Sequence, residues 1–193
     1  PGDWRNQKAH GGGMVLDWGI HLLDQALRIG EGRKLISVYA ELTNVTNEEC
    51  DDGFRVTLIF EGDLSMYVEV TTSNFIELPR WYILGENGSA VINDWDLNGE
   101  IVKVSDWENR DAVPILAGVG LTKTMAPRTD DTIKHYPLPK VDSSWTQFYE
   151  NVFAALRGEE EQLITHDQQR RLLKLVDAIF ESGNENKVVF FDK

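Results

Sequence analysis

The sequence has little cysteine and no long apolar run. Its single cysteine, Cys50, cannot close an intrachain disulfide, so a scaffold held by internal crosslinks is excluded and a cytoplasmic location is expected. No apolar run approaches the roughly 20 residues of a membrane-spanning helix, and the N-terminal residues show no basic segment followed by an apolar one. We therefore expect no membrane partner.

Positive charge is also scarce. The 193 residues carry 19 basic against 32 acidic side chains, a formal net charge of −13 at pH 7. Nucleic-acid binding rests largely on lysine and arginine side chains that neutralise phosphates, so this balance argues against DNA or RNA as a partner. The composition is that of an ordinary globular protein, and the length predicts one domain over residues 1–193.

The stretch GGGMVLDWGIHLLD, residues 11–24, begins with three glycines and continues with helical spacing. We expect a helix from about Gly13 to Arg28, ended by Gly30 and Gly32. One stripe of this helix is apolar and suited to a core: Leu16, Ile20, Leu23 and Leu27. The stripe beside it is polar: Asp17, His21, Asp24 and Arg28. The polar groups of the motif therefore share one face.

Several segments alternate apolar and polar residues with period two, which predicts strands with one apolar face. They lie at 36–42, 54–60, 66–70, 99–106 and 132–136, with SAVIN after the turn ENG and KVVFF near the C-terminus. Short turns between them favour antiparallel pairing. Residues 109–131, which contain two prolines, are expected to form a long irregular loop.

Two further helices are expected after the strands, each with a capping box and a glycine stop. The residues placed for these roles are Ser144, Gln147 and Gly158 in the first and Thr165, Gln168 and Gly183 in the second. The order of elements predicts an α+β fold, an open, mainly antiparallel β-sheet with helices packed on one face. The other face, with Tyr39, Tyr67 and Trp81, suits either solvent or a partner.

The spacing of Asp17 and His21 suits acid–base chemistry. Side chains four apart on a helix are neighbours, so the carboxylate can accept a hydrogen bond from one ring nitrogen of the histidine and leave the other free. This is the arrangement of a base and the group that orients it. The alternative is a solvated polar stripe with an ion pair between Asp24 and Arg28, and spacing alone leaves both open.

The glycines favour a docked ligand. Gly19 inside a helix costs roughly 1 kcal/mol relative to alanine, and it indicates close approach by another backbone or a flat ligand. Gly11–Gly13 leave the first amides of the helix uncovered, so its positive end can face a ligand. Packing against a second helix, or an ordinary loop, explains the same glycines.

Other candidate sites are weaker. His10, Asp17, His21 and Asp24 could ligate zinc or iron, but their spacing matches neither a closed zinc site nor the paired histidines of a helical protease motif, and we expect no metal. The stretch GVGLTK at 118–123 lacks the context of a dinucleotide fingerprint. His135 and His166 are expected to have structural roles on a strand and in a helix cap.

The residues of the opening motif resemble the signature of the Gfo/Idh/MocA family, the relatives of glucose-fructose oxidoreductase and inositol dehydrogenase. That signature is a glycine run followed by D-x-G-x-H-x-x-D, and it fits Gly11–Gly13, Asp17, Gly19, His21 and Asp24. GENGSAVIN is similar to a hairpin of the family, and LLKLVDAIFESGNENKVV to its last helix and strand. The resemblance spans nearly the whole chain.

The resemblance implies the C-terminal substrate and oligomerisation domain of a two-domain enzyme, with a C-terminal fold like that of glyceraldehyde-3-phosphate dehydrogenase. An N-terminal Rossmann domain would bind NAD or NADP, and neither its fingerprint nor the Glu-Lys-Pro segment of the family occurs here. That departure fits the abrupt start at Pro1. The implied substrate is a sugar, cyclitol or related polyol, and the implied partner is a second copy of the chain bound through the sheet face.

Carried over to this sequence, the resemblance makes His21 the acid or base that handles the substrate proton, and Asp17 the residue that positions His21 and holds substrate. Trp4, Arg5 and Lys8 would lie near the substrate, and Gly11–Gly13 near the nicotinamide. The hypothesis is therefore an NAD(P)-dependent oxidoreductase whose isolated 193-residue domain is inactive. The alternative is a non-catalytic oligomerisation or binding module that uses the open sheet face.

Overall fold

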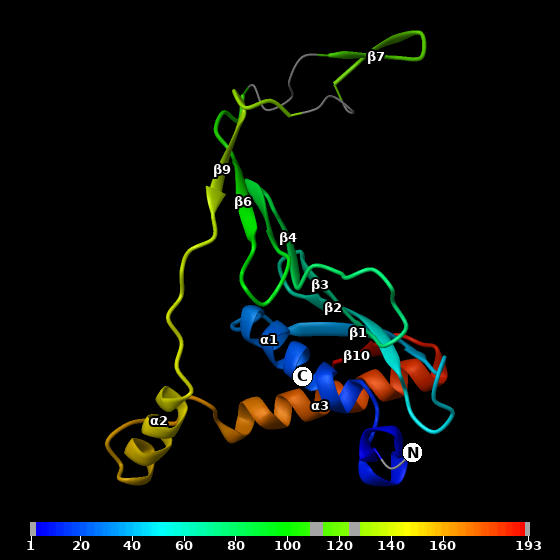
Figure 1. Cartoon of the computed structure of the whole chain (residues 1–193), viewed down its shortest axis with the longest axis vertical. Coiled ribbons are helices and arrows are strands. Elements are labelled where there is room, and N and C mark those ends of the chain that lie inside the picture. The colour runs from blue at the N-terminus through cyan, green and yellow to red at the C-terminus, as the bar shows by residue number, and fades with distance from the viewer. Residues whose placement is uncertain (1–2, 109–113, 124–127, 192–193) are drawn as a thin grey trace. The chain divides into compact units, whose positions relative to one another are not determined.

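The computed structural model describes residues 3–108, 114–123 and 128–191, which fall into two compact units (Figure 1). The first unit comprises Pro1–Phe75 with Trp145–Lys193, and the second comprises Ile76–Ser144. Two compact units do not establish two independently folding domains, so the single domain expected from the length stays a prediction.

The first unit is built on a four-stranded antiparallel sheet in the order β10-β1-β2-β3. Its strands are β1 (Leu35–Thr43), β2 (Gly53–Phe60), β3 (Leu64–Thr71) and β10 (Val189–Phe190). The register aligns Ala40 with Val56 and Val56 with Val68. Because side chains alternate between faces, this register gathers the apolar residues of three strands on one face.

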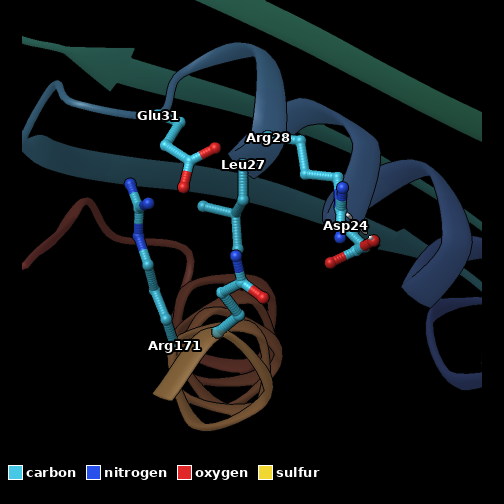
Figure 2. A pocket seen from close by; sticks show the side chains of 6 residues that line it. Asp24, Leu27, Arg28, Glu31 and Arg171 are labelled. Atoms are coloured by element: carbon cyan, nitrogen blue, oxygen red, sulfur yellow. Dashed lines mark ion pairs between the residues drawn. The ribbon is translucent and has the colours of Figure 1, made fainter. Parts of the chain in front are cut away.

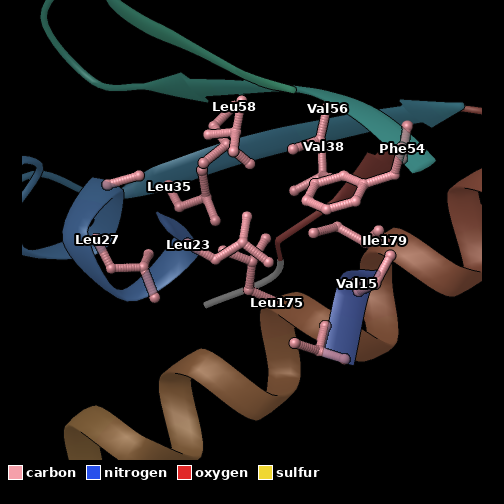
Figure 3. Packing of buried hydrophobic residues seen from close by; sticks show 14 of the residues in the cluster. Val15, Leu23, Leu27, Leu35, Val38, Phe54, Val56, Leu58, Leu175 and Ile179 are labelled. Carbon is pink, nitrogen blue, oxygen red and sulfur yellow. The ribbon is translucent and has the colours of Figure 1, made fainter. Parts of the chain in front are cut away.

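Two helices cover that apolar face, α1 (Ile20–Ile29) and α3 (His166–Glu185). Figure 3 shows Leu23 of α1 and Leu175 and Ile179 of α3 in one buried cluster with the sheet residues. The side chains of Leu23, Leu58, Leu175 and Ile179 have no solvent exposure. The opposite face leaves Tyr39, Ile59 and Tyr67 exposed. The predicted α+β fold with helices on one face of an antiparallel sheet is confirmed.

The second unit contains its own four-stranded antiparallel sheet, in the order β4-β5-β6-β9. These strands are β4 (Trp81–Gly85), β5 (Gly88–Ile92), β6 (Gly99–Val104) and β9 (Ile133–Pro137). The predicted strands are therefore present but belong to two sheets, because period-two alternation identifies strands without identifying which strands pair. A hairpin of β7 (Ile115–Ala117) and β8 (Gly120–Thr122) replaces part of the irregular loop expected at 109–131. Residues 109–113 and 124–127 of that loop lie outside the described residues.

The helix ends confirm some of the expected capping and stop residues and contradict others. The capping box of Thr165 and Gln168 is present at the start of α3. The box expected at Ser144 and Gln147 is not, because α2 (Thr146–Leu156) begins after Trp145 without a side-chain cap. Gly158 follows α2 in the left-handed conformation, as a stop requires. Gly183 is no stop, since α3 continues to Glu185 and ends at Asn186, also left-handed.

Gly183 lies inside α3 for a packing reason. A side chain there would overlap the Leu42 side chain of β1. The preceding residue, Ser182, is fully buried and joins the same two elements. Its hydroxyl accepts from the Ala40 N–H at 2.8 Å and donates to the Lys187 carbonyl at 2.6 Å. The end of α3 is thereby fixed to β1 by both packing and hydrogen bonds.

Candidate active site

Two short 3₁₀ turns lead into the glycine run, η1 (Trp4–Asn6) and η2 (Lys8–His10). The carboxylate of Asp3 caps the first turn by accepting from the Arg5 N–H at 3.1 Å. Gly11 closes the second turn in the left-handed conformation, with φ of 75°. The segment that carries the predicted substrate residues is therefore ordered by its own backbone.

The amides of the glycine run are all used within the chain. Gly11, Gly12 and Gly13 donate to the carbonyls of Lys8, Gln7 and Arg5, at 3.1, 3.0 and 2.9 Å. The next two amides, of Met14 and Val15, donate to the backbone and the side chain of Asp51. The expectation that these amides are open to a ligand is therefore wrong, because acceptors from the preceding turns and from a distant loop reach them first.

Close packing explains most of the glycines. A side chain at Gly12 would overlap the Arg5 carbonyl, and one at Gly13 would overlap the Asp51 carboxylate. A side chain at Gly19 would come within 2.7 Å of the Phe54 ring, so the close neighbour of Gly19 is a core residue of β2 rather than a ligand. Of these positions only Gly11 faces open space.

The helix begins two residues later than expected and begins as a π-helical turn, η3 (Val15–Gly19), which runs into α1. In this turn the Gly19 N–H donates to the Met14 carbonyl, five residues back, at 2.7 Å. π turns inserted in α-helices are rare and occur frequently at functional sites. Asp17 lies in the middle of this turn.

Asp17 is paired with Arg5 and not with His21. The Arg5 Nε donates to Asp17 Oδ2 at 3.1 Å, and the Asp17 side chain is only 20% exposed. The wider π turn separates Asp17 from α1, so the neighbour relation of an unbroken α-helix, on which the Asp17–His21 hydrogen bond was predicted, does not apply. His21 is exposed on α1 and makes no hydrogen bond or ion pair with the described residues.

The predicted substrate residues have different environments. Trp4 is 47% exposed, and the Arg5 guanidinium stacks on its ring, 4.6 Å from the ring centroid. Lys8 is exposed in η2. Arg5 therefore links the Trp4 ring to the Asp17 carboxylate, and the structure brings these three of the predicted residues together. The alternative ion pair of Asp24 with Arg28 is also present, at 3.5 Å.

A loop between β1 and β2, residues 44–52, supplies residues that the motif did not reveal. Asp51 is 7% exposed, and burial raises the pKa of its carboxyl, against the opposing effect of the Val15 N–H bond. Burial likewise raises the pKa of Cys50, whose thiol lies 3.6 Å from the Arg5 carbonyl. In the sequence, this loop shows only two adjacent acidic residues before a predicted strand. Their spacing does not indicate a contact with the helix.

Asp52 is the acidic residue with the strongest hydrogen bonding in this loop. Its carboxylate accepts from the Thr46 N–H, the Thr46 hydroxyl at 2.9 Å and the Asn47 N–H at 3.2 Å. Burial alone would raise its pKa, but the hydrogen bonds from Thr46 outweigh burial and lower the pKa to about 2. The charged form therefore stabilises the loop.

We expect Asp52 to make the fold acid-sensitive. Its pKa is lower in the folded chain than the ordinary value of about 3.9, so its stabilising contribution is present above about pH 4 and is lost as the pH falls towards about 2. That contribution is up to about 2 kcal/mol. The measurement is urea unfolding followed by tryptophan fluorescence from pH 5 to pH 2 in about half-unit steps.

The Asp52→Asn variant is the matched comparison for this prediction, because it keeps the side-chain size and one acceptor oxygen. Its free energy of unfolding should fall less steeply with acid than that of the parent chain. Equal slopes for the two proteins would show that Asp52 does not carry the acid sensitivity.

A shallow depression lies on the first unit between α1 and α3 (Figure 2). Its lining residues are Asp24, Leu27, Arg28, Glu31, Gln168 and Arg171. It includes neither Asp17 nor His21, and it is far smaller than the roughly 300 Å³ of a usual ligand pocket. His21 is exposed, whereas Asp17 is partly buried.

Residues 3–108, 114–123 and 128–191 contain no group of three or more His, Cys, Asp or Glu side chains that could hold a metal ion. No helix in the same ranges is long and apolar enough to cross a membrane. His135 pairs with Glu100 across β9 and β6 at 2.7 Å, and His166 is exposed at the first turn of α3.

Comparisons with known proteins find relatives of this chain. Residues 1–91 match a family model described as the GFO/IDH/MocA C-terminal domain. The scyllo-inositol 2-dehydrogenase (NADP(+)) of Bacillus subtilis (strain 168) is 21% identical in an alignment of 193 positions that covers 98% of this chain and 52% of that protein.

Two solved structures show the same fold. An NAD-binding protein from Listeria innocua is 44% identical, with a TM-score of 0.89 over 99% of this chain and 55% of that one. The WlbA dehydrogenase from Bordetella pertussis, in complex with NADH and UDP-GlcNAcA, is 19% identical, with a TM-score of 0.60 over 94% of this chain and 46% of that one. The chain thus spans about half the length of the relatives it matches.

Proposed function

Because the chain belongs to the Gfo/Idh/MocA family of oxidoreductases, as a C-terminal domain, we propose that it carries the substrate site and the acid–base residues of an NAD(P)-dependent oxidoreductase. The reaction is hydride transfer between a nicotinamide and a carbinol carbon of a sugar, cyclitol or related polyol. One observation carries the proposal. His21 is exposed and unpaired among the described residues, on the helix that directly follows the Asp17–Arg5 ion pair.

His21 is assigned the proton transfer. Oxidation of a carbinol requires that its hydroxyl lose a proton as the carbon loses a hydride, and the reverse reaction requires that the carbonyl oxygen gain one. An imidazole whose two ring nitrogens are not committed to other groups can perform either step near neutral pH. Its exposure leaves room for a substrate hydroxyl to approach.

Asp17 is assigned substrate orientation. Its Oδ2 accepts from Arg5, while its carboxylate as a whole retains further acceptor sites for a polyol hydroxyl. The hydrogen bond from Arg5 fixes the direction of the carboxylate. Trp4 and Lys8, on the 3₁₀ turns next to Arg5, complete the proposed substrate residues.

The described residues do not form a dinucleotide site of their own. The amides at the helix start are used internally, and side-chain space at Gly12 and Gly13 is filled by Arg5 and Asp51. Of the three glycines only Gly11 has open space around it, so we propose that Gly11 lies near the nicotinamide. The filled space beside Gly12 and Gly13 is less compatible with a bound nicotinamide. When bound by the whole protein, NAD or NADP supplies the hydride acceptor or donor.

The test of this function uses the intact natural protein that contains the chain. We expect it to reduce NADP+ or NAD+ in the presence of scyllo-inositol or a related polyol, followed by the absorbance of the reduced nicotinamide. The isolated 193 residues should give no turnover. Failure of the intact protein with both nucleotides and a panel of cyclitols and sugars would overturn the proposal.

A non-catalytic module is the second candidate, and one observation favours it. The face of the first sheet opposite the helices exposes Tyr39, Ile59 and Tyr67, at 36%, 39% and 60%. An apolar and aromatic sheet face of this kind suits association with a second copy of the chain. Oligomerisation through this face is compatible with catalysis. It would be the main function of the chain only if the catalytic proposal were overturned.

A further inference from the structure

The helix that bears Asp17 and His21 is held at its start by a residue from another part of the chain. Asp51 Oδ2 accepts from the Val15 N–H at 2.8 Å, and the Asp51 backbone carbonyl accepts from the Met14 N–H at 3.0 Å. The residue before η3 provides no side-chain cap of its own. Asp51 thus satisfies two amides that a helix start leaves without partners.

The fit between Asp51 and the glycine run is close. Gly13 has φ of 115°, and the space that a side chain would occupy there is filled by the Asp51 carboxylate. Asp51 itself is 7% exposed, so its carboxylate faces the helix start and not the solvent. Any movement of this carboxylate therefore requires movement of residues 13–15.

The same region also fixes Arg5. The Arg5 carbonyl accepts from the Gly13 N–H at 2.9 Å and lies 3.6 Å from the thiol of Cys50, the residue before Asp51. The Arg5 side chain then pairs with Asp17. Asp51 consequently acts on both members of the ion pair, through Val15 on the side of Asp17 and through Gly13 on the side of Arg5.

We propose that Asp51 is a positioning residue, which sets the direction of the Asp17–Arg5 pair and of the turn before His21 without touching substrate. Its catalytic consequence rests on the proposed function, whereas its effect on the ion pair does not. Displacing a reacting group by about 1 Å can cost roughly 100-fold in rate. A carboxylate buried behind the helix can therefore control turnover.

The experiment compares three variants of the intact natural protein. Asp51→Ala removes the cap, and Asp51→Asn keeps the size and one acceptor oxygen and should rescue it. Ser182→Ala is the stability control, because it removes a buried hydrogen-bonding group of α3 that contacts neither the glycine run nor Asp17. Loss of Ser182 should lower the urea midpoint of unfolding by an amount similar to loss of the cap.

The first readout is the Arg5 Nε–H signal in the ¹H–¹⁵N spectrum of protein labelled on arginine, assigned by its absence in Arg5→Lys. We expect a shifted, slowly exchanging signal in the parent, Asp51→Asn and Ser182→Ala proteins, and its loss in Asp51→Ala. Retention of that signal in Asp51→Ala, or its equal loss in Ser182→Ala, would overturn the proposal whatever the catalytic function.

The second readout is steady-state kinetics with scyllo-inositol and NADP+. Asp51→Ala should lower kcat roughly 10- to 100-fold with KM changed by less than about threefold, while Ser182→Ala leaves kcat within about twofold. An unchanged kcat in Asp51→Ala, with the Arg5 signal lost and His21→Ala inactive, would overturn the kinetic part. An active His21→Ala would instead overturn the proposed function and leave the Arg5 readout to decide on Asp51.

Discussion

Replacing His21 by alanine in the intact protein should lower kcat roughly 100- to 10,000-fold, the range measured for loss of a general acid or base. The physical reason is that no other titratable side chain of the described residues is both on this helix surface and free of a partner. Asp17 is committed to Arg5, and Asp24 to Arg28. The measurement is the steady-state rate of nicotinamide reduction, with the oligomeric state followed by light scattering.

The matched control for this prediction is His166→Ala. His166 is also an exposed histidine on a helix of the first unit, at the first turn of α3. It should retain parental kcat, and both variants should keep the parental oligomer size. If His21→Ala retained kcat within about twofold, the catalytic assignment would be wrong and the sheet-face module would become the better reading of the chain.

Replacing Gly13 by alanine should destabilise the first unit by about 2–5 kcal/mol, the sum of a disfavoured backbone conformation and an overpacked contact. The φ of 115° is one that side-chain-bearing residues rarely adopt. The added methyl group would also overlap the Asp51 carboxylate and expel it from the helix start. The measurement is the free energy of unfolding in urea.

Gly11→Ala is the comparison that separates the cost of the backbone conformation from the cost of the overpacked contact. Gly11 also has a positive φ, 75°, but open space surrounds the position of its side chain. Only the conformational cost of about 1–2 kcal/mol should therefore appear. Equal losses for Gly11→Ala and Gly13→Ala would mean that the contact with Asp51 contributes nothing.

The fold class and the core were predictable because they depend on periodicity. Leu23 and Leu27 were expected on a buried stripe, and the alternation around Val56 predicted a strand with one apolar face; both are found in one core. The division of the strands between two sheets was not predictable, since alternation does not say which strands pair. The hairpin at Ile115–Thr122 was missed because its strands are only three residues long.

The sequence names the residues of the candidate site, but it does not reveal their contacts. The motif placed Asp17 and His21 on one segment, and the resemblance added Trp4, Arg5 and Lys8. The pairing of Asp17 with Arg5 depends on a π turn, which leaves no simple pattern in the sequence. The role of Asp51 depends on a contact between residues 36 positions apart, and local reasoning about helix caps looks only at adjacent residues.

The most direct test of the central claim is to follow the hydride itself. The intact protein would be incubated with NADP+ and scyllo-inositol carrying deuterium on every ring carbon, and the nucleotide would be analysed by mass spectrometry. Deuterium in the reduced nicotinamide, absent with His21→Ala over the same period, is the result that the proposed function predicts. Turnover of the polyol without deuterium in the nucleotide would contradict it, because the bond broken would then not be the carbinol C–H.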